Sequence, residues 1–197
     1  MKNQIKHQDK RQNNDSDDFL KVIHGRKSVR NYTGAPVSND DIEDLLRAGM
    51  AAPSAVDRRP WSFIAVTERE TLDRLSKATP FSGMLKKAGA AVIVCGIPMK
   101  SLVKMKLINL VAGVSNDYWV QDCSAATENI LLAAEAKGLG AVWIGIHPVE
   151  AKVETVRKIL NIPDNVTPLN IISIGHPLGT EKPKNKFDEN NIHWEHW

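Results

Sequence analysis

A cationic cluster near the start of the chain carries residue types that bind phosphate. Within five residues it holds Arg26, Lys27, Ser28, Val29 and Arg30. In an extended segment alternate side chains share a face, so the two arginines and the serine would project together, away from the lysine and the valine. Two guanidinium groups and a hydroxyl on one face suit a phosphate, because arginine offers paired planar donors. A solvated run of charge is the alternative interpretation.

The bulk composition is that of a globular protein of one domain. The chain has 197 residues, of which 42% are hydrophobic and 25% charged, and its formal net charge is +3. No apolar run approaches the roughly 20 residues that span a bilayer, so we expect no membrane association. The charges of both signs are interspersed, and without a concentrated basic face we expect no nucleic-acid partner.

The cysteines and histidines do not form a recognisable metal or redox motif. Cys95 and Cys123 lie far apart in the sequence, which favours reduced thiols in the core and a reducing, cytoplasmic location. The polar N-terminal residues do not form the apolar segment of a secretory signal. His193 and His196 have a spacing that could bind a metal, but no third ligand is apparent, so we predict no metal site.

Hydrophobic periodicity predicts the elements that must position the cationic cluster. The polar residues 1–18 predict a disordered or frayed extension, and an apolar periodicity from Asp18 then predicts a helix that Gly25 ends. Further helices are predicted after an N-cap at Ser38, after a capping box at residues 67–70, over residues 117–137, and from Pro148 as the first helical residue. Strands are predicted over residues 62–66, 90–95, 141–146 and 168–174.

Two segments have a less usual pattern. Residues 117–137 are apolar nearly all round, which is typical of a helix in the middle of a protein or at a subunit interface. Residues 99–115 interleave apolar residues with lysines, and we interpret them as a helical insertion that either forms a lid or faces a dimer partner.

The alternation of helices and strands would permit a doubly wound sheet with buried faces. The glycines of Gly138-Leu139-Gly140 do not form a dinucleotide fingerprint, because they follow a helix and precede a strand.

Four landmarks then occur in one order along the chain. They are RKSVRNY at residues 26–32, APS at 52–54 with PW at 60–61, NILLAA at 129–134 with GLGAVWIG at 138–145, and IGHP at 174–177 with KNKF at 184–187 and IHW at 192–194. On these motifs the sequence resembles the FMN-dependent nitroreductase family over most of residues 19–197.

The resemblance implies an α+β fold with a central mixed β-sheet flanked by helices. It also implies an intertwined homodimer, in which residues 178–197 form a C-terminal arm that contacts the partner subunit.

The same resemblance implies a set of cofactor-binding residues for one tightly bound FMN per subunit. Those at the FMN phosphate and ribityl chain are Arg26, Lys27, Ser28, Arg30, Lys184 and Lys186. Those that reach the flavin ring from the neighbouring subunit are Pro53, Ser54, Ala55 and Asp57. The backbone N–H groups of Ile144 and Gly145 are expected near flavin N5, and no side chain is expected to act as a catalytic acid or base.

The sequence departs from the family pattern at the flavin ring. Asp57 stands where the family usually has Asn, and Arg59 where it has Gln, so an ionised Asp57 could be paired with Arg58 or Arg59. Residues 81–84 lack the amide and the basic residue that many members direct to the pyrimidine edge. We expect Trp143 to be a core residue rather than one that stacks on the flavin.

The activity implied by the resemblance is that of an NAD(P)H-dependent FMN oxidoreductase. Hydride would pass from NAD(P)H through flavin N5 to a small organic acceptor, such as a nitroaromatic or a quinone, by a ping-pong mechanism. Two alternatives stay open: a specialised branch that fragments flavin or removes halogen, and a flavin-binding or regulatory protein without turnover.

Overall fold

The computed structural model describes residues 17–97 and 118–197. Most of the predicted N-terminal extension and the predicted insertion at residues 99–115 lie outside these ranges. Among the described residues, no helix combines the length and the apolar character that crossing a membrane requires.

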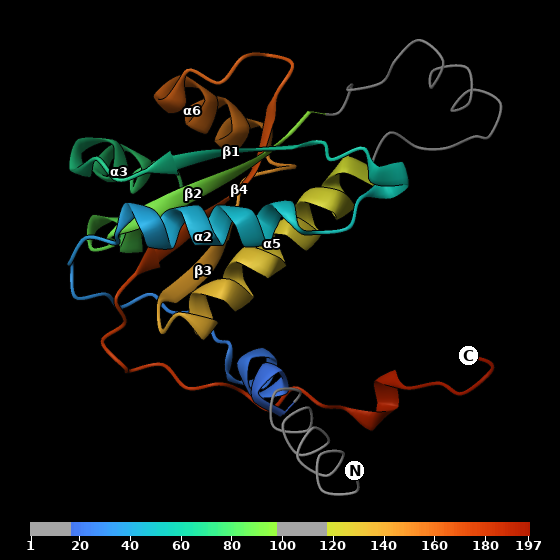
Figure 1. The fold of residues 1–197 in the computed structure, drawn as a ribbon. Coiled ribbons are helices and arrows are strands. Elements are labelled where there is room, and N and C mark those ends of the chain that lie inside the picture. The colour runs from blue at the N-terminus through green and yellow to red at the C-terminus, as the bar shows by residue number, and fades with distance from the viewer. Residues whose placement is uncertain (1–16, 98–117) are drawn as a thin grey trace, which may run out of the picture.

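A four-stranded sheet in the order β1-β2-β4-β3 forms the centre of the molecule (Figure 1). The strands are β1 (Trp61–Val66), β2 (Ala90–Gly96), β3 (Gly140–Gly145) and β4 (Thr167–Gly175), close to the predicted ranges. All three neighbouring pairs are antiparallel. Within the described residues the parallel component of the expected mixed sheet is limited to an isolated bridge between Ser28 and Ala141.

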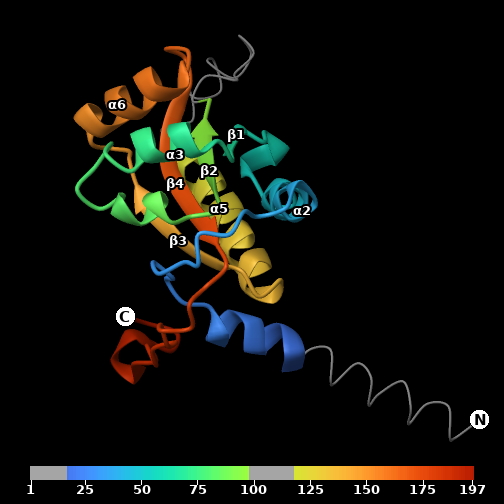
Figure 2. The same ribbon diagram turned by 90° about the vertical axis from the view of Figure 1, so that its left-hand side faces the viewer.

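Helices cover both faces of this sheet, as Figure 2 shows. Helices α2 (Asn39–Met50) and α5 (Tyr118–Ala136) lie on one face, and α3 (Arg69–Leu75) and α6 (Glu150–Leu160) on the other. The two faces form separate apolar clusters, one around Leu45 and Ile130 and one around Leu75 and Ile171. Burial on both faces explains why the central strands are continuous apolar runs even though they pair antiparallel.

One predicted helix start is confirmed and two are displaced. The Ser38 hydroxyl accepts a hydrogen bond from the Asp41 N–H at 3.1 Å and so caps α2. Thr67 does not cap α3, because the first helical bond runs from the Leu72 N–H to the Glu68 carbonyl. Pro148 is not the first residue of α6, because a turn precedes the helix, closed by a bond from the Val149 N–H to the Ile146 carbonyl.

Both cysteines are buried free thiols, as predicted. Burial raises the pKa of Cys95 and of Cys123 to about 12. The Sγ atom of Cys123 lies 3.7 Å from the carbonyl oxygen of Cys95, which joins α5 to β2.

The helical residues 17–25 lie beside the C-terminal arm in both views (Figures 1 and 2). Both segments carry large apolar side chains that are exposed in the single chain. They are Phe19, Leu20 and Ile23 on the helix and Phe187, Ile192, Trp194 and Trp197 on the arm.

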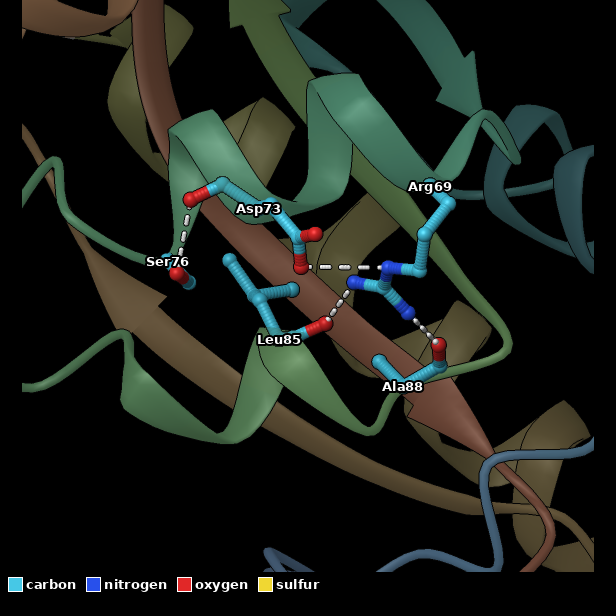
Figure 3. Close-up of polar contacts among 5 residues, drawn as sticks. All are labelled: Arg69, Asp73, Ser76, Leu85 and Ala88. Atoms are coloured by element: carbon cyan, nitrogen blue, oxygen red, sulfur yellow. Dashed lines mark hydrogen bonds and ion pairs between the residues drawn. The ribbon is translucent and has the colours of Figure 1, made fainter.

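A guanidinium group fixes the short helix η2 (Gly83–Lys86) against α3 (Figure 3). Arg69 donates from Nη2 to the Leu85 carbonyl at 2.5 Å and from Nη1 to the Ala88 carbonyl at 3.0 Å. Asp73, one turn along α3, accepts from Nε at 3.1 Å and orients the guanidinium plane. This contact matters to the site because η2 forms one wall of the cavity described below.

Replacing Arg69 with Met should destabilise the protein, because two carbonyl groups at the end of η2 lose charged donors. We expect the free energy of unfolding to fall by about 1–3 kcal/mol, measured by urea denaturation. Arg74→Met is the matched control, since Arg74 is exposed on the same helix, and we expect a change within about 0.5 kcal/mol. Equal stabilities for the two variants would contradict the role assigned to Arg69.

Candidate functional site

The cationic cluster is held as a short extended segment along the outer edge of β3. The Val29 N–H donates to the Ala141 carbonyl at 3.0 Å, and Ser28 bridges Ala141 in parallel. Val29 is buried and packs on Gly140, where an added Cβ would lie 2.6 Å from Val29 Cγ1. The segment can approach the strand this closely only because residue 140 has no side chain.

A buried tyrosine fixes the same segment to the centre of the sheet. The Tyr32 hydroxyl lies 2.7 Å from the carbonyl oxygen of Val29 and 3.2 Å from that of Ser173 on β4. Burial raises the pKa of Tyr32 well above its ordinary value, so the hydroxyl remains a donor at physiological pH.

The predicted alternation of side chains is confirmed for Val29 and only in part for Lys27, which shares a cavity with the other three side chains. Lys27 points to α5, where its ammonium donates to Glu135 at 3.0 and 3.3 Å, while Val29 is buried. Arg26, Ser28 and Arg30 border a cavity of about 390 Å³. Lys27 borders it too, but its ammonium is bound to Glu135.

The C-terminal arm supplies the opposite side of this smaller cavity. The Leu178 N–H donates to the Asn31 carbonyl, and Glu181 accepts from the backbone N–H groups of Arg30 and Asn31 at 2.9 and 3.1 Å. The Arg30 N–H holds the pKa of Glu181 below its ordinary value. These bonds bring Lys184 and Lys186 into the same cavity as the cationic cluster, together with Lys182, which the sequence analysis missed.

The cationic character of this cavity is partly compensated. Arg26 Nε lies 3.2 Å from Glu128 Oε1 on α5, and the Glu181 carboxylate borders the cavity. Neither carboxylate could be anticipated from the sequence, because α5 and the arm become neighbours of the cluster only in the folded chain.

A second and larger cavity, of about 900 Å³, continues along β3. Its walls include residues 142–145 of β3 and Phe81, Gly83 and Met84 in and beside η2. Arg30 borders both cavities, so the two are neighbours. Trp143 also lines this cavity and is 36% exposed, so the expectation that it is a core residue is wrong. It lies on an edge strand, and its side chain faces the cavity.

The direction of the backbone groups along β3 distinguishes Gly145 from Ile144. Ala141 accepts from Val29 on the outer side, while the Ile146 N–H donates inward to the Leu169 carbonyl at 3.1 Å. In an antiparallel strand alternate residues bond to alternate sides, so the even-numbered residues of β3 bond to β4. The N–H of Gly145 therefore points to the open edge beside the cavity, and that of Ile144 points to β4.

The loop that contains Pro53, Ser54, Ala55 and Asp57 lies elsewhere in the chain. The Ala55 N–H donates to Asp122 near the start of α5, whereas Lys27 binds Glu135 near its end, about 20 Å away along the helix. The described residues that line the two cavities include none from this loop. A single chain thus does not bring these four residues to the cationic cluster.

Asp57 is paired within its own loop. Arg59 donates to both carboxylate oxygens, from Nε at 2.7 Å and from Nη2 at 2.5 Å, and this keeps the pKa of Asp57 below its ordinary value. Val56, Asp57 and Arg59 all have positive φ angles. A β-branched residue in this region is strained, which indicates that the loop conformation is specifically maintained.

The donor set fits FMN. A small cavity lined by arginine, lysine and hydroxyl groups suits a phosphate, and it adjoins a larger, partly apolar cavity beside the outward backbone N–H of Gly145. Among the described residues, no group of three or more His, Cys, Asp or Glu side chains is placed to hold a metal. The arrangement can therefore anchor a phosphorylated planar cofactor and orient its ring at Gly145.

Comparisons with known proteins identify the family of the chain. The profile of the Nitroreductase family matches residues 23–176. A protein of Archaeoglobus fulgidus named "Putative NADH dehydrogenase/NAD(P)H nitroreductase" is 41% identical over 92% of this chain and 99% of its own length.

Solved structures show the same fold. A crystal structure from Parabacteroides distasonis, which carries the same name, has a TM-score of 0.82 at 46% identity and covers 91% of this chain and 99% of that one. An FMN-dependent nitroreductase from Clostridium difficile has a TM-score of 0.79 at 26% identity, covering 90% and 99%. The chain belongs to the nitroreductase family.

Proposed function

We propose that this NAD(P)H-dependent flavin oxidoreductase binds FMN tightly and reduces a small organic acceptor, such as a nitroaromatic or a quinone, by a ping-pong mechanism. The observation that carries the proposal is that Arg30 borders both cavities. The proposed phosphate anchor thus neighbours the cavity that Gly145 lines. The FMN-dependent relative from Clostridium difficile, with the same fold, supports this choice of cofactor.

The residues of this chain have separate tasks in the proposal. Arg26, Ser28, Lys184 and Lys186 hold the phosphate by charge-assisted hydrogen bonds. The Gly145 N–H orients the ring and stabilises charge that develops beside it. When bound, FMN supplies the hydride chemistry at N5, and the protein supplies position and electrostatics.

The chain is proposed to act as a homodimer. The loop at Pro53 to Asp57 lies too far from the cationic cluster of its own chain, so it would serve the site of the partner subunit. The exposed apolar residues of helix 17–25 and of the arm, with Trp194 and Trp197 at 81% and 101% exposure, support burial against a partner. The reduced thiols support a cytoplasmic location.

Anaerobic mixing of the purified, FMN-loaded protein with NADPH or NADH tests the activity. We expect the visible flavin absorbance to bleach and then to recover when a nitroaromatic compound is added. Flavin that stays oxidised with both donors would support a binding protein without turnover. Bleaching without recovery by nitroaromatics or quinones would favour a specialised branch.

Removing one cation from each side of the small cavity should release FMN. In Arg26→Ala/Lys184→Ala two charge-assisted contacts are lost, so we expect the dissociation constant of FMN to rise about 10²- to 10⁴-fold, measured by flavin fluorescence. Lys27→Ala is the control from the same cluster, because its single ammonium contacts both carboxylate oxygens of Glu135, whereas the ion pair of Arg26 with Glu128 is made through Nε; we expect a change of less than about fivefold. An equal loss of affinity in both variants would place Lys27 at the phosphate instead.

Substituting Gly145 separates the role of its N–H from that of its small size. An added Cβ at this position meets no atom within 4 Å, so Gly145→Ala should retain activity. Gly145→Pro removes an N–H that is not part of the β3–β4 ladder, and we expect the rate of flavin reduction by NADPH to fall about 100-fold in stopped-flow measurements. Similar rates for the two variants, with unchanged thermal unfolding, would exclude a role for this N–H.

A further inference from the structure

The larger cavity has a surplus of positive charge. Arg30, Lys87 and Lys152 line it, and the described residues that line it include no Asp or Glu. None of these three side chains takes part in an ion pair among residues 17–97 and 118–197. Three unpaired cations around one partly apolar cavity favour an anionic occupant.

The FMN phosphate does not account for this surplus. The small cavity has cations of its own on the arm, Lys182, Lys184 and Lys186, besides Arg26. Lys87 and Lys152 border only the larger cavity, where the uncharged ring of oxidised flavin would lie. Their charges therefore remain uncompensated when oxidised FMN, whose ring is uncharged, has bound.

Lys152 is held at the reacting end of the cavity by neutral groups. Its Nζ lies 3.4 Å from the carbonyl oxygen of Gly145 and 5.9 Å from the centre of the Phe81 ring. Lys152 also lies in the first turn of α6, where the helix dipole disfavours a cation. Lys152 thus occupies a position that is unfavourable for a cation, with its ammonium directed to Gly145. A ligand that needs a positive charge there would explain this placement.

Aromatic side chains accompany these cations. Phe81 and Trp143 both line the cavity, and they are 72% and 36% exposed. Exposed aromatic faces can stack on a planar ring, while ammonium groups beside them bind an attached anionic group. The combination selects a flat aromatic molecule that carries negative charge.

We propose that the preferred acceptor of this enzyme is an aromatic compound with an anionic substituent close to its ring, such as a carboxylate, and that Lys152 is the residue that selects it. The inference rests on the proposed function and narrows its substrate class. A small acceptor fits better than NADPH as the source of the charge, because the phosphates of NADPH are separated from the nicotinamide ring by a ribose. Lys152 lies beside Gly145, at the reacting end.

Two acceptors of nearly equal shape test the proposal: 4-nitrobenzoate and its neutral analogue 4-nitrobenzamide. The value of kcat/KM is measured for each with the FMN-loaded wild type and with Lys152→Met. Because the intrinsic reactivity of each acceptor is the same for both proteins, the change in the ratio isolates the effect of charge. We expect Lys152→Met to lower the benzoate-to-benzamide ratio about tenfold, and high salt to lower it in the wild type.

Two further variants serve as controls. Lys152→Arg should keep most of the preference, since it retains the charge. Lys158→Met removes an exposed lysine from the same helix and should leave the ratio within about twofold of the wild type. Calorimetric binding of 4-nitrobenzoate to the oxidised, FMN-loaded protein gives a readout without turnover, and we expect its dissociation constant to rise about tenfold in Lys152→Met.

The outcomes separate this inference from the proposed function. An unchanged ratio in Lys152→Met, with normal turnover of 4-nitrobenzamide, overturns the inference and leaves the proposed function intact. A change confined to the preference for NADPH over NADH assigns the charge to the donor and also overturns it. Wild-type flavin that NAD(P)H does not reduce overturns the proposed function instead, while the calorimetric comparison still tests the anion preference of the cavity.

Discussion

The backbone pairing of Val29 with Ala141 is the contact on which the site depends. It holds the cationic cluster in an extended conformation on the outer edge of β3. In an extended backbone alternate side chains lie on the same side, so Arg26, Ser28 and Arg30 can border one cavity. The same segment then receives the C-terminal arm through backbone bonds to Asn31 and the carboxylate of Glu181. Two parts of the chain about 150 residues apart thereby enclose one cavity.

An edge strand is ordinarily a hazard, because its free backbone groups invite pairing with other chains. In this protein one part of the β3 edge is covered and another part is open. The cationic cluster covers it at Ala141, and further along it is left open beside the larger cavity. The open section presents the N–H of Gly145, so the uneven coverage of one strand edge creates both the proposed phosphate anchor and the place where we propose that the cofactor ring is oriented.

The features that could be predicted from the sequence are those determined by neighbouring residues or by the spacing of hydrophobic residues along the chain. The alternation in the cationic cluster, the Ser38 cap and the apolar strands all follow from residues close to one another in the chain. The antiparallel order of the strands could not be predicted, because burial on both faces gives the same apolar run in either sheet type. The exposure of Trp143 and the direction of Lys152 depend on the position of β3 at the edge of the sheet. The sequence near β3 does not indicate that position.

Gly140 shows how a residue without a side chain can control a ligand that it does not touch. It borders neither cavity, yet the space above its Cα is filled by Val29, whose position sets the direction of the neighbouring side chains that we propose bind phosphate. A map of the site drawn only from ligand contacts would omit it. A methyl group added at residue 140 would collide with Val29 and displace the segment that carries the proposed anchor, although it would not itself reach the ligand.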